Sequence, residues 1–306
     1  MKILIVANYN PGKFSIFVIE QTNTIKRQGV EVDFFGVQGK GILGYLSNLG
    51  ALKKKIREYQ PDIVHAHYGL CGLLANLQRK VPVVTTFHGS DIHALKSNLF
   101  FSRIAIRLSA YNIFVSKSLL KLSGYKGTKQ AVIACGVDIN LFHPIERLKA
   151  RELLGWDIDA KYVLFAGAFD NEVKNYPLAK DAVALMKDVK LVELKGFTHE
   201  QVNLAMNAAD CLLVTSFREG SPLVVKEAMA CNTPIVSVIV GDVVETTQGS
   251  EGSYLSTHNA NQLAECLRQA LAFKGKTNGR QFVIERQLST ECIAKRIVNI
   301  YKQIAK

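Results

Sequence analysis

The 306-residue chain contains no apolar run of about 18 residues, the length that a membrane-spanning helix needs. None of its six cysteines forms a C-x-x-C pair, and several stand inside apolar runs such as "ADCLLV" and "EAMACN". Cysteines used in this way are typical of small buried side chains in a reducing compartment. The apolar run in "MKILIVANYN" is too short for a secretory leader and favours a first β-strand. We therefore expect a cytoplasmic protein.

The chain also lacks the signatures of several function classes. No helix-turn-helix, zinc-finger or RNP-type motif is present, so nucleic acid is not an expected partner, although the net charge of +12 favours anionic ligands. No G-x-G-x-x-G follows the first strand, which argues against a dinucleotide oxidoreductase, and no G-x-S-x-G elbow indicates a hydrolase. His65 and His67 alternate on a predicted strand and share one face. Two histidines without a third ligand are a poor metal site, so no bound metal is expected.

What the chain does contain is a regular alternation of short β-rich runs with longer segments of helical spacing. The runs lie at 2–8, 30–36, 62–67, 81–87, 112–116 and 130–135, and again at 161–167, 189–196, 210–216 and 233–241. This alternation is typical of parallel sheets covered by helices. Residues 136–162 hold turn residues and a proline but no strong strand, so they are the expected linker region.

We therefore predict an α/β protein of two doubly wound, Rossmann-like domains that face each other across a cleft. The first domain covers residues 1–143 and the second covers residues 144–285. Residues 286–306 carry isoleucines at helical spacing and should form a terminal helix that packs back on the first domain. Ligands of open parallel sheets bind outside the carboxyl ends of the strands, so functional residues are expected in the loops that follow those ends.

One such loop and the helix after it read "FREGSPLVVKEAMA", residues 217–230. Ser221 is a good N-cap, and Pro222 suits the first helical position because its missing N–H would have no partner there. The free N–H groups of the first turn, near Leu223, would form an anion site. Gly220 would let a ligand approach the backbone closely.

Two glutamates flank this predicted anion site. Glu219 precedes the helix, and Glu227 lies on it. A carboxylate on either side of an anion site suits a sugar nucleotide, whose diphosphate lies between two sets of sugar hydroxyls. The alternative is that Glu219 complements the helix dipole while Glu227 is solvated. The position of Glu227 inside an apolar helix favours a functional role, because buried glutamates are usually paired or functional.

The segment "EGSPLVVKEAMACNTPIV" resembles the glutamate-x7-glutamate region of glycosyltransferase family 4, a large group of retaining sugar-nucleotide transferases with the GT-B fold. "QPDIVHAH", "TTFHGSDIH", "CGVDINLFHP" and "MNAADCLLVTS" are similar to further family segments in the family's order, so the resemblance covers nearly the whole chain. It implies a hexosyltransferase that uses a UDP- or GDP-sugar, without metal or cofactor. It also implies retention of the anomeric configuration and a glycan or lipid-linked sugar acceptor on the first domain.

The resemblance also implies roles for single residues. Glu219 would contact hydroxyls of the donor sugar, Glu227 would hold the ribose, and Lys174 would neutralise the departing diphosphate. His88 would reach the donor sugar from the first domain. The implied catalytic residues are His88, Lys174 and Glu219, and the implied donor-binding residues are Gly12, Lys174, Glu219, Gly220, Ser221, Pro222, Leu223 and Glu227.

Two positions and the length of the second domain depart from the family pattern. Ala168 stands where the family usually carries an arginine, so one of two expected cations is missing, and Arg218 beside Glu219 is a candidate substitute. Asn232 replaces the usual glycine after the helix, where asparagine tolerates the left-handed conformation. The second domain shows one strand where the family usually has two, so we expect it to be trimmed by about one βα unit.

Several alternatives stay open on the sequence alone. The missing arginine and the trimmed domain are consistent with a catalytically weak nucleotide-sugar-binding or scaffold protein. A sugar-nucleotide epimerase would share the fold. A glycosidase would use the two glutamates, but the anion site between them would have no task in that chemistry. Residues 41–60 combine an apolar stripe with a basic end, and form either a packed helix or a peripheral contact with the inner face of an anionic membrane.

Overall fold

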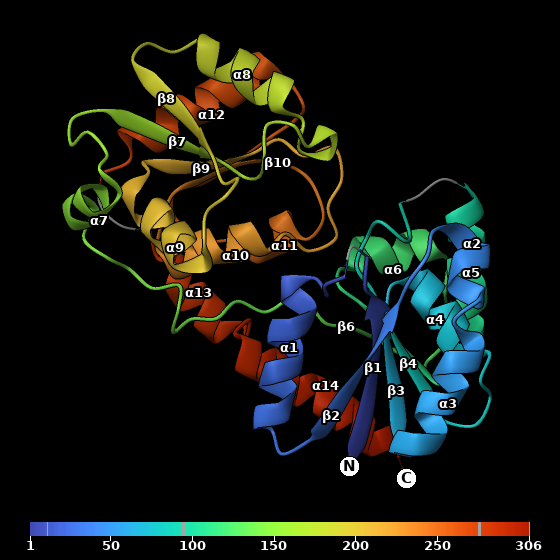
Figure 1. The fold of residues 1–306 in the computed structure, drawn as a ribbon. Helices are drawn as coiled ribbons and strands as arrows, with labels where there is room; N and C mark the ends of the chain where they lie inside the picture. Colours follow the sequence, from blue (N-terminus) through green and yellow to red (C-terminus); the bar gives the residue numbers. More distant parts are fainter. Residues whose placement is uncertain (11, 94–95, 275–276, 306) are drawn as a thin grey trace. The chain divides into compact units, whose positions relative to one another are not determined.

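The computed structural model describes residues 1–10, 12–93, 96–274 and 277–305, apart from the side chains of 96–98. Its contacts divide the chain into two compact units (Figure 1). Unit 1 comprises Met1–Cys135 together with Thr290–Lys306, and unit 2 comprises Gly136–Ser289. Each unit is built on its own parallel sheet, which confirms the predicted α/β class with two Rossmann-like domains.

Unit 1 contains a six-stranded sheet in the order β2-β1-β3-β4-β5-β6. The strands are β1 (Lys2–Asn8), β2 (Glu31–Val37), β3 (Ile63–His67), β4 (Val83–Phe87), β5 (Tyr111–Phe114) and β6 (Gln130–Val132). Every residue of β3 and β4 is buried because helices cover both faces of the sheet. The helices are α1 (Ile16–Arg27), α2 (Gly41–Leu46), α3 (Leu49–Tyr59), α4 (Gly69–Asn76), α5 (Lys96–Leu108), α6 (Lys117–Ser123) and α14 (Thr290–Ile304).

The C-terminal helix α14 belongs to unit 1, although the chain reaches it only after unit 2. It lies beside α1 on one face of the sheet (Figure 1). Its apolar stripe joins alternate residues of β1, Ile3 and Ile5, in one buried cluster. The stripe consists of Ile293, Ala294, Ile297, Val298, Ile300 and Tyr301. The 3.6-residue spacing of the stripe explains why this segment forms an amphipathic helix.

Unit 2 contains a five-stranded sheet in the order β11-β10-β9-β7-β8. The strands are β7 (Lys161–Phe165), β8 (Val189–Glu193), β9 (Cys211–Val214), β10 (Ile235–Val238) and β11 (Ser253–Ser256). Helices α8 and α12 cover one face of the sheet, and α9 and α10 cover the other (Figure 1). The helices are α7 (Arg147–Leu154), the 3₁₀ turn η1 (Glu172–Lys174), α8 (Tyr176–Ala184), α9 (His199–Ala208), α10 (Leu223–Ala230), α11 (Val243–Thr247), α12 (Ala260–Ala272) and α13 (Gly279–Glu285).

Of the two edge strands of the unit 2 sheet, β8 was predicted from the sequence and β11 was not. Residues 185–210, all described, hold the single strand β8, as the trimmed-domain interpretation expects. Strand β11 was not anticipated. This strand is short and partly polar, so it lacks the apolar run that indicates a central strand. It lies at the edge of the sheet, where most of its residues are only partly buried.

The first division of the chain lies at residues 135–136 rather than at 143–144 as predicted, and the second at 289–290 rather than at 285–286. Residues before Pro144 belong to unit 2 because the Arg280 guanidinium of α13 binds their backbone. It donates to the carbonyl oxygens of Ile139 and Phe142, each at 2.8 Å. Composition placed the boundary at the proline, whereas these long-range hydrogen bonds attach the preceding residues to the second unit.

The segment at 41–60 forms two helices, α2 and α3, rather than one. They are separated near Asn48. The side-chain Nδ2 of Asn48 donates to the carbonyl oxygens of Gly44 at 2.7 Å and Tyr45 at 3.2 Å. Leu52 and Ile56 of α3 are buried against the sheet, which supports the packed-helix interpretation of this segment. No helix within the described ranges is long and apolar enough to cross a membrane.

Candidate functional site

The strands β7 and β9 are neighbours in the unit 2 sheet, and the loops that leave their carboxyl ends are joined by hydrogen bonds. Thr215, just after β9, donates its hydroxyl to the carbonyl oxygens of Lys174 at 2.8 Å and Asn175 at 3.1 Å. The N–H of Phe217 donates to the carbonyl oxygen of Val173 at 3.0 Å. These bonds place the η1 turn against the loop that carries Glu219.

Lys174 and Glu219 form an ion pair at this junction. Nζ lies 2.7 Å from Oε1, and the side chains are 23% and 16% exposed. Both residues were predicted as site residues from segments that lie 45 positions apart. The structure therefore brings a cation and a carboxylate together beside the start of α10, where an anionic ligand with hydroxyl groups would meet both.

Two glycines allow the loops to approach this closely. A Cβ on Gly167, two residues after β7, would lie 2.7 Å from Cγ of Lys174, so the lysine stem passes directly over the glycine. Gly241, which follows β10, has φ +59°. A Cβ on Gly241 would lie 2.9 Å from the carbonyl oxygen of Gly220, so the β10–α11 loop packs against the turn before α10.

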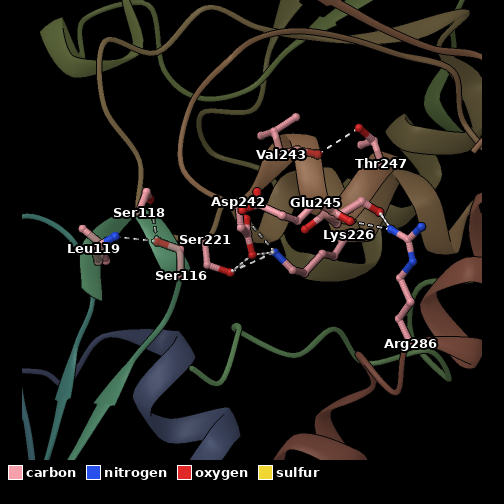
Figure 2. Close-up of polar contacts among 11 residues, drawn as sticks. Ser116, Ser118, Leu119, Ser221, Lys226, Asp242, Val243, Glu245, Thr247 and Arg286 are labelled. Carbon is pink, nitrogen blue, oxygen red and sulfur yellow. Dashed lines mark hydrogen bonds and ion pairs between the residues drawn. The ribbon is translucent and has the colours of Figure 1, made fainter. Parts of the chain in front are cut away.

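The start of α10 differs from the prediction. The helix begins at Leu223 with Pro222 as its N-cap, one position later than expected. Ser221 does not cap it, because its hydroxyl bonds the charged side chains of Lys226 and Asp242 instead (Figure 2). Charged partners make stronger hydrogen bonds than a backbone N–H. The first-turn N–H groups of α10 lack acceptors within the helix, as at every helix start, and stand next to Glu219.

The other predicted residues of unit 2 fall around this turn. Glu227 lies one helical turn beyond Leu223 on α10 and is partly buried. Asn232 follows the helix with φ +57°, so the predicted left-handed conformation is confirmed. Ala168 lies in the loop between β7 and η1, and Arg218 is exposed beside Glu219.

The two site residues predicted in unit 1 lie at the carboxyl ends of β1 and β4. Gly12 has φ +82° and is exposed, and its neighbour at position 11 lies outside the described residues. His88 directly follows β4 and is partly buried. His67 Nδ1 and His88 Nε2 share a hydrogen bond of 3.0 Å, and Phe17 lies 4.8 Å from the His88 ring.

His88 belongs to a buried cluster of polar rings. His65 and His67 stack at 4.6 Å, which confirms that they share a face of β3. His65 bonds Thr86 Oγ1 through Nε2 at 2.8 Å and Tyr301 Oη of α14 through Nδ1 at 2.5 Å. The alternation of histidines in "HAH" was the sequence signal for this cluster, but nothing local pointed to Tyr301.

Burial controls the charge of this histidine cluster. It lowers the pKa of His67 to about 3 and holds the pKa values of His65 and His88 well below the ordinary value, with a smaller contribution from the neighbouring histidines. All three rings are therefore neutral near pH 7. Burial raises the pKa of Asp91 to about 6, although the N–H groups of Gly69 and Gly89 donate to its carboxylate. The described residues contain no cluster of three or more His, Cys, Asp or Glu side chains suited to hold a metal ion.

A cavity of about 490 Å³ opens beside these loops of unit 1. Its walls combine aromatic rings with amide, hydroxyl and charged groups. They are formed by Ala7, Asn8, Asn10, Lys13, Phe14, Ser15, Tyr45, Tyr68, Leu70, Ser90, Asp91 and Ser102. Aromatic faces beside hydrogen-bonding groups suit a ligand that has both apolar faces and hydroxyls, as a sugar ring does.

Comparison with known proteins gives the same assignment for both units. The model of Glycosyltransferase Family 4 matches residues 20–141, and that of Glycosyl transferases group 1 matches residues 163–272. A putative teichuronic acid biosynthesis glycosyltransferase of Bacillus subtilis is 26% identical over an alignment of 244 residues, which covers 70% of this chain and 62% of that protein. The chain spans about three fifths of the length of the curated relatives that it matches.

Solved structures agree on the fold. Sucrose-phosphate synthase of Thermosynechococcus elongatus superimposes with a TM-score of 0.87 at 20% identity, covering 99% of this chain and 98% of that one. HepE of Anabaena, in complex with UDP-glucose, superimposes with a TM-score of 0.72 at 19% identity, covering 100% and 98%. With one family match in each unit, the chain belongs to glycosyltransferase family 4 and has the GT-B fold.

Proposed function

We propose that this member of glycosyltransferase family 4 transfers a sugar from a nucleotide-diphosphate donor to a glycan or a lipid-linked sugar. The observation that carries the proposal is the Lys174–Glu219 ion pair beside the first-turn N–H groups of α10. A cation and a row of N–H groups suit a diphosphate, and the adjoining carboxylate suits sugar hydroxyls. Family membership supports a UDP- or GDP-sugar as donor and retention of the anomeric configuration.

In this proposal the two loops bind different parts of the donor. The diphosphate accepts hydrogen bonds from the N–H groups near Leu223, and Glu219 accepts hydrogen bonds from donor-sugar hydroxyls. Lys174 has three N–H donors, so it can bind a phosphate oxygen while it keeps Glu219 as a partner. When the bond between the anomeric carbon and the phosphate oxygen breaks, negative charge grows on the diphosphate. A preorganised cation at that point stabilises the transition state more than the ground state.

The remaining site residues are assigned by the family resemblance. Glu227 would bind the ribose hydroxyls, and Gly12 would leave room for the diphosphate in unit 1. His88 would contact the donor sugar as a neutral ring that can donate or accept a hydrogen bond without adding charge. The cavity of unit 1 would take the acceptor. Its hydroxyl oxygen bonds to the anomeric carbon as the bond to the diphosphate breaks, and the hydroxyl proton passes to the departing diphosphate oxygen. No metal or cofactor is assigned a step in this proposal.

The decisive experiment replaces Lys174 by alanine and measures transfer of labelled sugar and hydrolysis of the donor. We expect kcat/KM to fall by about 10²–10³-fold, because one charge-stabilising donor of the transition state is lost. The matched control is Lys190→Ala in the same unit. Lys190 lies on β8, is exposed, and forms a 3.7 Å ion pair with Asp157. Equal activities of the two variants would contradict the assignment of Lys174.

The missing arginine at Ala168 favours one alternative, a nucleotide-sugar-binding protein with little catalytic activity. Titration with UDP and GDP, followed by the transfer assay, separates the two. Tight nucleotide binding without transfer or hydrolysis would favour the binding protein. Conversion of the donor into its epimer, without transfer, would favour an epimerase.

A further inference from the structure

A lysine side chain is buried immediately beside the proposed donor site. Lys226 lies on α10 (Figure 2). Its side chain has no exposed surface. Its Nζ lies 2.9 Å from Ser221 Oγ, 3.0 Å from Asp242 Oδ2 and 3.2 Å from Asp242 Oδ1. The three N–H groups of the ammonium therefore have three acceptors, and the charge is paired with the carboxylate of Asp242.

Ser221 closes the ring of hydrogen bonds. Its hydroxyl donates to Asp242 Oδ2 at 2.7 Å and accepts from Lys226. A hydroxyl has one hydrogen, so its direction is fixed by the carboxylate. Ser221 is also buried, and it stands between Gly220 and Pro222 in the turn that precedes α10. The network formed by Ser221, Lys226 and Asp242 therefore holds that turn from its buried side.

Asp242 stands at the start of a helix whose far end is bound by an arginine. It immediately precedes α11, whose last carbonyl groups are bound by the guanidinium of Arg286 (Figure 2). Arg286 donates to the carbonyl oxygens of Glu245 and Thr246, each at 2.6 Å, and also to that of Gln248. A cation at the end of a helix satisfies carbonyl groups that have no partner within the helix. The carboxylate that fixes the donor turn is thus anchored through α11 to a residue that follows α13.

Stability alone is a weak reason for this arrangement. Removing an ammonium and a carboxylate from water is unfavourable, and apolar residues of similar volume often replace a buried ion pair without loss of stability. What a buried pair can supply is one defined geometry. The pair is also neutral as a whole, so it adds little net positive charge to the site and does not replace the arginine missing at Ala168. Its effect on a bound donor would be exerted through the position of the turn.

We propose that Ser221, Lys226 and Asp242 are positioning residues that hold the turn at Glu219–Leu223 in the conformation that binds the sugar-nucleotide donor. This inference rests on the proposed function, since it concerns the same site. The network and the turn both belong to unit 2, whereas the cavity assigned to the acceptor is lined by residues of unit 1. Loss of the network should therefore weaken the use of the donor and leave the KM for the acceptor unchanged.

The test removes the whole network while nearly conserving volume, in the triple variant Ser221→Ala/Lys226→Met/Asp242→Leu. We expect this variant to fold, to use the donor with a kcat/KM at least tenfold lower, and to keep the acceptor KM. Hydrogen exchange of residues 217–224, measured without ligand, should become faster. The matched control is Arg151→Met/Asp210→Leu, which removes another ion pair of unit 2, with a 3.0 Å contact between a buried arginine and a partly buried aspartate, beside the amino end of β9.

A second pair of variants guards against a general loss of folding. Ser221→Thr keeps the hydroxyl and should retain most of the activity, whereas Ser221→Ala should raise the donor KM several-fold. Wild-type protein without nucleotide binding or transfer would refute the proposed function, and the exchange measurement would then decide the positioning role by itself. Unchanged exchange at 217–224 in the triple variant, or an equal change in the Arg151/Asp210 control, would overturn this inference.

Discussion

Two buried polar clusters lie near the carboxyl ends of the two sheets, and they are stabilised in opposite ways. The cluster of unit 1 contains His65, His67 and His88 with Tyr301, and burial keeps its rings neutral. The cluster of unit 2, described above as the network of Ser221, Lys226 and Asp242, joins a buried lysine to a carboxylate. The side chains of the first cluster are neutral, whereas the second cluster contains a positive and a negative charge that form an ion pair.

The difference shows how each cluster should fail. A neutral cluster depends on the protonation state of its rings, so it is sensitive to acid, and the loss of one hydrogen bond has a modest cost. An ionic cluster depends on the presence of both partners, because removal of one leaves the other charge buried and unpaired. The following predictions test that contrast, from the largest expected effect to the smallest.

The largest effect is expected from Lys226→Met alone. The substitution conserves volume but leaves Asp242 buried without its cation, so the free energy of unfolding of unit 2 should fall by about 3–5 kcal/mol. Urea denaturation, followed by hydrogen exchange in unit 2, measures the change. Combining the substitution with Ser221→Ala/Asp242→Leu should restore most of the loss. A loss below about 1 kcal/mol in the single variant would show that the pair is not a closed ionic cluster.

Mild acid should destabilise unit 1 selectively. Because burial lowers the pKa of His65 and His67 below the ordinary value of about 6.5, the unfolded chain binds more protons than the folded one below that pH. The contribution of these neutral rings to the free energy of unfolding is fully present above pH 6.5 and is lost as the pH falls below it. Asp91, whose raised pKa of about 6 acts in the opposite direction, offsets part of this loss. We expect a net loss of about 2 kcal/mol between pH 7 and 5.5.

Hydrogen exchange at the two pH values, corrected for intrinsic rates, measures this loss in each unit separately. The histidines at 65 and 67 are the fully buried ones, and both lie in unit 1. Residues of unit 2 therefore serve as the internal reference. Equal losses of protection in both units would contradict the assignment of the acid effect to the histidine cluster.

The smallest effect is expected from Tyr301→Phe. The substitution removes the hydroxyl that bonds His65 Nδ1 but keeps the ring in the apolar cluster. The free energy of unfolding of unit 1 should fall by about 1 kcal/mol, the net value of one hydrogen bond. Thermal denaturation compares it with Lys302→Ala on the exposed side of α14. A loss as large as that of Lys226→Met would remove the contrast between the two clusters.

Much of the fold could be predicted from the sequence because its signals are local. The run "KILIVAN" predicted β1 at its observed position, Lys2–Asn8, and the alternation of strands and helices predicted two parallel sheets. Lys174 was identified through the resemblance of a short segment to the family, and Glu219 from its place before a predicted helix and from the same resemblance; the structure brings the two together in an ion pair. Such motifs can be found in a sequence because their functional groups are carried by consecutive residues of one loop.

Other features could not be predicted, because their partners are distant in the chain. Ser221 was expected to cap α10, yet a carboxylate 21 positions later takes its hydroxyl. His65 finds Tyr301 at a separation of 236 residues. The chain divides at residues 135–136 because Arg280 binds the segment that follows. The local sequence around a residue does not indicate which distant residue will be its partner in the folded protein.

By itself, the sequence determined the class of the fold, most of its strands and helices in their chain order, and the residues that stand at the ends of those strands. Apolar periodicity and turn residues are enough for that, because secondary structure responds mainly to neighbours in the chain. Only the tertiary structure decided which polar groups share a buried environment, and hence which remain neutral and which are paired as ions. The free energy of a buried polar group depends on its partner and on the exclusion of water, and both are properties of the packed protein.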